Sequence, residues 1–397
     1  MIDWVAIQPL IGGMALGAEE ALGCPPKEIV SYSELPHEKH LLEYYNKKGR
    51  SIPYNIINCN DEYEKTFNID VAIAVPICSG LSMLNSCSTG EKARGVDAIQ
   101  NDNMYNVTDL ALRVMKVKSF ILENAPALAT NMGKEVLDNL KKIAADNSYS
   151  MTIIKTSTVL HGIPQNRKRT FVIFWNTEFA PSLSFYKRDC PSVENYLKQI
   201  PKKVSFKNYT AKDAVLDTNF YYLYLKDKFG KDYRKAIKEN NCVTAADYLN
   251  KFHLFDEAID FAKKIGDEKQ QRIIERFKRK RSMGMGYWDN SIHFGVKEGY
   301  TPAIIGKNMW RLLHPTEERF YNIRELMWLM GLPHDFELLD KKFVNHITQN
   351  VPVPAARDWI LEIKKFLNNE LSFSDSKIVL HDNFKRKPLS NTFEKLY

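Results

Sequence analysis

Short apolar runs alternate with helical patterns over the first part of the chain. The runs at 4–7, 28–32, 69–75, 119–122 and 170–174 predict β-strands, and a glycine turn before 15–22 predicts a helix. Near-continuous apolar strands separated by helices are typical of a parallel sheet that is covered on both faces. We therefore expect an α/β domain in which ligands bind beyond the carboxyl ends of the strands.

The pattern changes near residue 180, where the strand–helix rhythm is lost. The following stretch is rich in Lys, Tyr and Phe, and its basic run over 272–281 precedes a glycine-rich segment that contains Tyr287 and Trp288. A helical pattern returns from about 310 and ends in a strong helix over 355–369. We predict a first domain over 1–179, a smaller and irregular domain over 180–305, a return to the first domain over 306–371, and a polar, basic tail over 372–397.

Composition narrows the class of protein. A chain of 397 residues exceeds what one hydrophobic core usually needs, which favours two domains. The formal net charge of +8 fits a nucleic-acid partner, although a merely solvated basic surface would give the same value. No apolar run approaches the roughly 18 residues of a membrane helix, and the first residues do not resemble a signal peptide. We expect a cytoplasmic protein without membrane contact.

The six cysteines include no Cys-x-x-Cys pair, so neither a metal site nor a disulfide framework is predicted. Cys78 differs from the others in its setting, because it lies on a loop that follows the apolar strand at 69–75. Reactive cysteines need such a setting, whereas most lone cysteines are inert. Cys78 is therefore either a nucleophile or a buried thiol under a loop.

Two further segments place chemistry next to predicted strands. Glu123 comes directly after the strand at 119–122, where a carboxylate acts either as a cap or in catalysis. Gln165, Arg167 and Arg169 precede the strand at 170–174, and in an extended segment they would share one face. Two arginines on one face could bind an anion or a carbonyl group, although a solvated basic loop is also possible.

In this order, the three segments resemble the motifs of the cytosine-5 DNA methyltransferase family. Family members carry Pro-Pro-Cys-Gln, Glu-Asn-Val and Gln-x-Arg-x-Arg where this chain has Pro76-Ile77-Cys78-Ser79, Glu123-Asn124-Ala125 and Gln165-Asn166-Arg167-Lys168-Arg169. The segments 311–319, 324–333 and 346–354 are similar to the later family motifs. The resemblance spans both ends of the chain and skips the middle domain.

The resemblance implies a Rossmann-like methyltransferase domain with a target-recognition domain in the middle of the chain. In this interpretation Cys78 attacks C6 of a cytosine that has been flipped out of double-stranded DNA. Glu123 would donate a proton to N3, and Arg167 would hold the C2 carbonyl group. Gln165 and Arg169 complete the expected catalytic set, and a monomer is expected.

The methyl donor that the resemblance implies is S-adenosylmethionine. The positions expected to contact the donor are Gln8, Leu10, Gly12, Gly13, Glu34, Pro76, Gln349 and Asn350. The positions expected to contact the DNA substrate are Ser79, Ser82, Arg281 and Tyr287.

The donor loop departs most from the family pattern, since Ala6 stands where the family has Asp and Gln8 where it has Phe. Either the pocket is remodelled around the same donor, or it accepts a modified one. A nucleic-acid-binding homologue without turnover and an RNA cytosine methyltransferase are the alternatives. The divergence would suit a modification enzyme of a mobile element or phage, acting in a bacterial or phage-infected cell.

Overall fold

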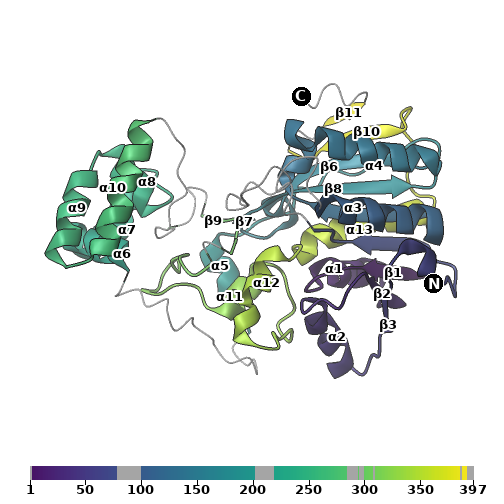
Figure 1. The fold of residues 1–397 in the computed structure, drawn as a ribbon, viewed down its shortest axis with the longest axis horizontal. Helices are drawn as coiled ribbons and strands as arrows, with labels where there is room; N and C mark the ends of the chain where they lie inside the picture. Colours follow the sequence, from purple (N-terminus) through teal and green to yellow (C-terminus); the bar gives the residue numbers. More distant parts are fainter. Residues whose placement is uncertain are drawn as a thin grey trace. The chain divides into compact units, whose positions relative to one another are not determined.

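The computed structural model describes residues 2–77, 100–201, 219–283, 294, 299–306, 309–384 and 387–390. The chain divides into two compact units, whose elements are labelled in Figure 1. Unit 1 comprises Met1–Ile163, Arg167–Cys190 and Met330–Tyr397, and unit 2 comprises Pro164–Asn166 and Pro191–Leu329. The inserted unit therefore extends to residue 329, further than the expected end at 305.

The core of unit 1 is a sheet that has nine strands within the described residues, in the order β11-β10-β6-β8-β5-β4-β1-β2-β3. These strands are β1 (Trp4–Ile7), β2 (Glu28–Ser31), β3 (Tyr54–Ile56), β4 (Val71–Ala74), β5 (Ser119–Asn124), β6 (Ser150–Ser157), β8 (Lys168–Trp175), β10 (Ile378–Asp382) and β11 (Lys387–Ser390). All the strands predicted from apolar runs are present. The sheet is mixed rather than parallel, because β8 runs antiparallel to both β5 and β6.

The predicted polar tail contributes two strands to this sheet. β10 pairs in parallel with β6, and β11 pairs antiparallel with β10. Val379 and Leu380 are buried, but their apolar run is short and flanked by charged residues, which hid the strand in the sequence. The end of the chain is thus part of unit 1 rather than an appendage.

Helices cover the two faces of the sheet. The helices of unit 1 are α1 (Gly13–Leu22), α2 (Glu38–Lys47), α3 (Gln100–Asp109), α4 (Lys134–Asp146), α12 (Val344–Gln349) and α13 (Val353–Leu367). Alternate strand residues, Phe174 among them, share a core with α3 and α4. The next residue, Trp175, points to the opposite face and meets Phe366 of α13, with ring centroids 5.0 Å apart. α1 packs closely on α13, since a Cβ at Gly17 would lie 2.7 Å from the Val353 carbonyl oxygen.

Unit 2 is mainly helical where the sequence suggested an irregular domain. Its helices are α5 (Val193–Leu197), α6 (Phe220–Phe229), α7 (Tyr233–Glu239), α8 (Ala245–Lys251), α9 (Phe255–Lys264), α10 (Glu268–Ser282) and α11 (Ile323–Trp328). A short two-stranded sheet pairs β7 (Gln165–Asn166) with β9 (Thr301–Pro302). Tyrosine and phenylalanine side chains fill much of the helical core, so lysine-rich composition obscured the helical period. None of the helices in the described ranges is long and apolar enough to span a membrane.

Candidate functional site

Four neighbouring strands of unit 1 end at the same edge of the sheet. Ile7 at the end of β1 lies beside both Val30 of β2 and Ala74 of β4, and Ala74 lies beside Leu122 of β5. Three features therefore lie side by side at this edge: the start of the predicted donor loop after β1, the segment toward Cys78 after β4, and Glu123 near the end of β5. Cys78, Ser79 and Ser82 lie outside the described residues, which reach Ile77 on this loop.

Glu123 is buried beside Arg169 at this edge. Its side chain is 5% exposed, and Arg169 Nε lies 2.6 Å from its Oε1. The pairing of Asn124 with Thr170 brings Arg169, one residue before, to this position. Burial raises the pKa of Glu123 above its usual range, although the positive charges of Arg169 and Arg167 oppose the shift. The carboxyl group is thereby suited to holding a proton that it can donate.

Arg167 is buried and braces a different loop. Its Nη2 donates to the carbonyl oxygens of Thr348 and Asn350, at 2.9 and 3.0 Å. Gln165 instead belongs to unit 2, where its Nε2 donates to the Leu329 carbonyl at 2.7 Å and its Oε1 accepts from the Ile304 amide at 3.0 Å.

The expected common face of Gln165, Arg167 and Arg169 is not formed. β7 pairs with β9 and β8 begins only at Lys168, so no single strand carries the three side chains. The alternation rule applies within one continuous strand, and this segment contains a break between two. Among the described residues, Arg169 pairs with Glu123, whereas Arg167 and Gln165 donate to carbonyl oxygens in other parts of the chain.

The donor loop is shaped by close backbone contacts. The amide of Gly13 donates to Asn350 Oδ1 at 2.8 Å, and a Cβ at Gly13 would lie 2.0 Å from the Val351 carbonyl oxygen. Gln8 and Leu10 both adopt left-handed backbone conformations, with φ of 47° and 53°. Such conformations are costly for residues other than glycine and are often found at functional sites.

Asn350 offers a buried hydrogen-bond donor at the same place. Its side chain is 1% exposed, and Nδ2 has no hydrogen-bond partner among the described residues. A buried, unsatisfied donor is costly, so a bound ligand that accepts this hydrogen bond would be favoured. Pro76 is buried, whereas Gln349 is exposed and its Oε1 lies 3.0 Å from His37 Nε2.

The acid expected after β2 lies at the surface. Glu34 is exposed and pairs with Lys39 at 2.6 Å. A buried acid that follows β2 is Glu38, which accepts hydrogen bonds from Tyr54 OH at 2.5 Å and Ser31 Oγ at 3.3 Å. Burial raises the pKa of Glu38 to about 7, with the two hydroxyl groups opposing the shift. Sequence reasoning missed Glu38, although its place in the first turn of the helix after β2 was a usable signal.

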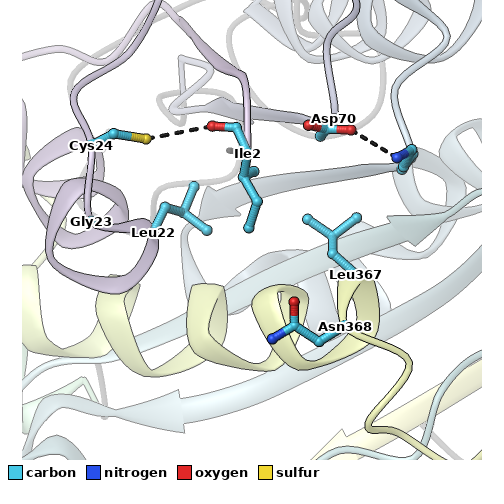
Figure 2. Close-up of a pocket in the computed structure, with 8 residues that line it drawn as sticks. Ile2, Leu22, Gly23, Cys24, Asp70, Leu367 and Asn368 are labelled. Atoms are coloured by element: carbon cyan, nitrogen blue, oxygen red, sulfur yellow. Dashed lines mark hydrogen bonds and ion pairs between the residues drawn. The ribbon is translucent and has the colours of Figure 1, made fainter.

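A separate pocket lies at the opposite edge of the sheet. It is lined by Ile2, Asp70 and Lys118, which precede β1, β4 and β5. Figure 2 shows Ile2 and Asp70 there, together with residues from the ends of α1 and α13. Lys118 pairs with Asp70 at 2.9 Å, and Cys24 Sγ donates to the Ile2 carbonyl at 3.4 Å. Because ligands of α/β sheets bind at the carboxyl edge, this pocket is not the candidate site.

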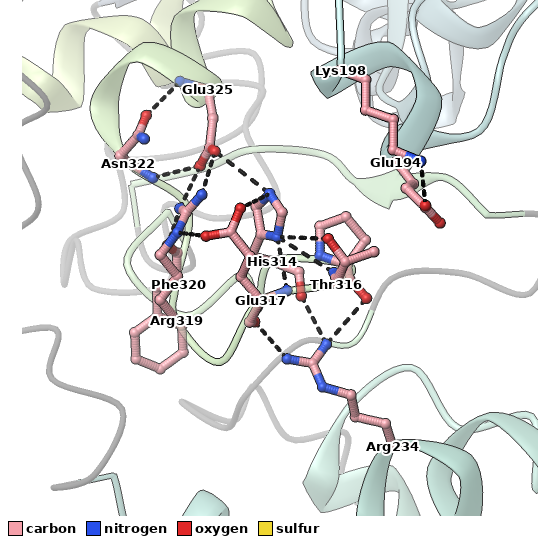
Figure 3. A network of polar contacts seen from close by, with 11 residues as sticks. Glu194, Lys198, Arg234, His314, Thr316, Glu317, Arg319, Phe320, Asn322 and Glu325 are labelled. Atoms are coloured by element: carbon pink, nitrogen blue, oxygen red, sulfur yellow. Dashed lines mark hydrogen bonds and ion pairs between the residues drawn. The ribbon is translucent and has the colours of Figure 1, made fainter.

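The motif-like segment from 311 to 329 holds unit 2 together. Arg319 makes two hydrogen bonds to Glu325 in α11, at 2.8 and 2.7 Å, and Glu325 Oε1 lies 3.5 Å from His314 Nε2 (Figure 3). Arg234 of α7 donates to the carbonyl oxygens of His314 and Glu317, at 2.7 and 2.6 Å. The polar residues of this segment therefore form hydrogen bonds within unit 2 that stabilise it.

A row of basic side chains lies along α10. Lys269, Arg272, Arg276 and Arg279 are exposed at intervals of three or four residues, so they share one face of the helix, here called the α10 basic stripe. Arg272 pairs with Glu268 at 3.0 Å. Arg281 also falls within α10, but its side chain is outside the described part of the chain, and Tyr287 lies wholly outside it.

Comparison with known proteins gives a consistent result. Residues 9–365 match the model of the family described as C-5 cytosine-specific DNA methylase. The "Putative type II methyltransferase M.MJ0563P" of Methanocaldococcus jannaschii is 22% identical over 316 residues, which cover 77% of this chain and 81% of that protein. Type II methyltransferase M.NmeDI of Neisseria meningitidis serogroup C is 22% identical over 257 residues, or 63% of this chain and 54% of that protein. The structure of Entamoeba histolytica methyltransferase EhMeth shares the fold, with a TM-score of 0.56 at 14% identity over 92% of this chain and 99% of that one.

Proposed function

The chain belongs to the C-5 cytosine-specific DNA methylase family, and we propose that it methylates cytosine in double-stranded DNA through a covalent bond between Cys78 and C6 of the base. Family membership makes it a DNA cytosine methyltransferase that uses S-adenosylmethionine. The observation that best supports the covalent route is Glu123, buried with a raised pKa at the strand end beside the one that leads to Cys78.

The described part of the donor site fits this cofactor. The backbone amide of Gly13 donates to Asn350 Oδ1, and the buried Asn350 Nδ2 is a donor without an acceptor among the described residues. When bound, S-adenosylmethionine supplies an electrophilic methyl group for C5. The residues that would surround it are Gln8, Leu10, Gly12, Gly13, Glu34, Pro76, Gln349 and Asn350. Glu34 would act from the surface, because its carboxylate is exposed.

The base side supplies the nucleophile and the proton. Addition of the Cys78 thiolate to C6 breaks the aromaticity of the ring and makes C5 nucleophilic. Glu123 donates its proton to N3 as negative charge develops there, and Arg169 stabilises the carboxylate that remains. Loss of the C5 proton to a base, return of the N3 proton to Glu123 and departure of Cys78 restore the aromatic ring.

Double-stranded DNA fits the remaining features. The target atom of a duplex is reached only when the base is flipped out, and the protein must then hold the opened DNA. The α10 basic stripe presents cations along one helix face, as binding to a phosphate backbone requires. Ser79, Ser82, Arg281 and Tyr287 are proposed to contribute further DNA contacts.

The proposal is tested by methyl transfer from radiolabelled S-adenosylmethionine to genomic duplex DNA, single-stranded DNA and transfer RNA. We expect incorporation into duplex DNA, none with Cys78→Ser, and a defined sequence context by bisulfite sequencing. Incorporation into RNA alone would favour an RNA methyltransferase. Tight donor binding without transfer to any of the three substrates would contradict the proposed activity.

A further inference from the structure

One side chain of α3 joins the exits of two strands. Asn103 Oδ1 accepts a hydrogen bond from the Ile77 amide at 2.9 Å, and Asn103 Nδ2 donates to Gln8 Oε1 at 2.6 Å. Gln8 is the first residue after β1, and Ile77 directly precedes Cys78. The side-chain amide of Asn103 therefore links the donor loop to Ile77, the residue that directly precedes Cys78.

The orientation of the amide is determined by its partners. The backbone N–H of Ile77 can only donate, so the Asn103 oxygen must face Ile77 and the Asn103 nitrogen must face Gln8. Gln8 is 4% exposed, which shields the hydrogen bond at its end from competition with water. The bridge thus has one arrangement, with each polar atom of Asn103 in use.

Gln8 needs such a support because its backbone is strained. It adopts φ of 47°, a region that residues with a Cβ rarely occupy. The backbone amide of Gln8 donates to the Val30 carbonyl of β2 at 2.9 Å, which fixes the backbone on one side. Asn103 holds the side chain from the other side. Conformations of this kind persist only where the surroundings enforce them.

We propose that Asn103 is a positioning residue that sets the donor loop and the Cys78 loop relative to one another. It acts through Gln8 on the donor loop and through Ile77 on the segment that leads to Cys78. In this way it sets the position of the methyl donor relative to the thiolate that attacks the cytosine. The inference rests on the proposed function, since it assigns Asn103 a part in that reaction.

The test compares Asn103→Leu, which keeps the size but removes both hydrogen bonds, with Asn103→Asp. An aspartate can still accept from Ile77, and it can accept from the Gln8 amide once that group rotates. Asn106→Leu is the matched control, because Asn106 is an exposed residue of the same helix. Each variant is measured by calorimetry with S-adenosylmethionine, by hydrogen exchange at the Ile77 amide and by methyl-transfer kinetics.

We expect Asn103→Leu to weaken donor binding about tenfold and to lower kcat by a similar factor, with the KM for DNA unchanged. Hydrogen exchange at the Ile77 amide should accelerate in Asn103→Leu. Asn103→Asp should keep most of the donor affinity and most of the kcat that Asn103→Leu loses. In Gln8→Ala, adding Asn103→Leu should weaken donor binding by less than about twofold, since the bridge is already broken.

Donor affinity and kcat of Asn103→Leu within about twofold of the Asn106→Leu values would overturn the proposal. So would full additivity of the Gln8 and Asn103 effects on donor binding. The calorimetric and exchange results do not depend on turnover. A wild-type chain that binds the donor but methylates nothing would therefore sink the proposed function, while the coupling of Gln8 and Ile77 through Asn103 would still be decided.

Discussion

The candidate site has two sides that are built from different kinds of group. The side proposed to face the cytosine, here called the base side, consists of charged groups. The buried Glu123 lies beside Arg169, and Arg167 is near enough to affect the pKa of Glu123. The described donor side consists of backbone and amide groups, in which Gly13 meets Asn350 and Gln8 adopts a left-handed conformation. Charge and burial determine the properties of the first side, and close packing of the backbone determines those of the second.

This difference predicts that the two sides respond to different kinds of substitution. A substitution that changes charge but keeps size should disable the base side and leave the donor side intact. A substitution that adds a single carbon should disable the donor side, because close-packed backbone groups cannot move apart cheaply.

The largest effect is expected for Glu123→Gln. The amide keeps the shape of the carboxyl group but cannot supply the proton to N3, so methyl transfer should fall by about 10²- to 10⁴-fold. Donor affinity, measured by calorimetry, should stay within about threefold of wild type. Glu135→Gln, at an exposed position of α4, is the control and should be fully active. A strong loss of donor binding in Glu123→Gln would show that the base side and the donor side are not independent.

Gly13→Ala should act in the opposite way. The added Cβ would lie 2.0 Å from the Val351 carbonyl oxygen, so the loop must move or the fold must yield. We expect a loss of about 1 to 3 kcal/mol in unfolding free energy and loss of measurable donor binding. In Gly49→Ala the Cβ meets open space but φ is +70°, so that variant measures the backbone strain alone. Equal effects of the two variants would argue against a steric role for Gly13.

A histidine cluster behind the donor side predicts a pH dependence of stability. His40 Nε2 lies 3.1 Å from His346 Nδ1, and the His346 ring stacks on His37 with centroids 3.6 Å apart. His346 lies in α12, directly before the segment that carries Asn350. Burial, reinforced by the positive charge of a protonated His37, lowers the pKa of His40 and His346 to about 4.

Because these pKa values are lowered on folding, the unfolded chain takes up protons first as the pH falls. The stability that the two neutral histidines contribute is complete above about pH 6.5 and is lost as the pH falls from about 6.5 to 4. The raised pKa of Glu38 has the opposite dependence, so the measurement is the difference in unfolding free energy between wild type and His346→Gln. A difference that does not change over this pH range would contradict the expectation.

The smallest effect is expected outside both sides, on the α10 basic stripe. Arg276→Ala should weaken duplex binding about three- to tenfold at low salt and lower the slope of log affinity against log salt by about one. Donor affinity should not change. Lys263→Ala on α9, where the lysine pairs with Asp260 at 3.2 Å, is the control. An unchanged salt slope in Arg276→Ala would exclude this arginine as a phosphate contact.

Much of the fold could be predicted because strands that are buried on both faces of a sheet leave near-continuous apolar runs. β1, β2, β4, β5 and β8 were predicted for this reason. The antiparallel direction of β8 could not be predicted, since direction depends on the connection and not on side-chain pattern. Helices α6 to α10 were missed because their cores are built largely from tyrosine and phenylalanine among lysines.

The site divides in a similar way. Glu123 was predicted to follow a strand over 119–122, but it lies within β5, because pairing with β8 extends this strand to Asn124. The bridge made by Asn103 could not be read from the sequence, since its two partners are distant along the chain. The role of Gln165 in unit 2 also depends on a pairing, β7 with β9, between two-residue strands that leave no period.

The most direct test of the central claim uses a DNA duplex with 5-fluorocytosine at the target position found by bisulfite sequencing. Fluorine at C5 cannot leave as a proton does, so the cysteine attached to C6 should remain bound after methyl transfer. We expect a denaturant-resistant protein–DNA complex whose digestion yields the nucleotide on the peptide that contains Cys78. Methylation of the ordinary duplex without such a complex, or attachment to another cysteine, would contradict the proposed role of Cys78.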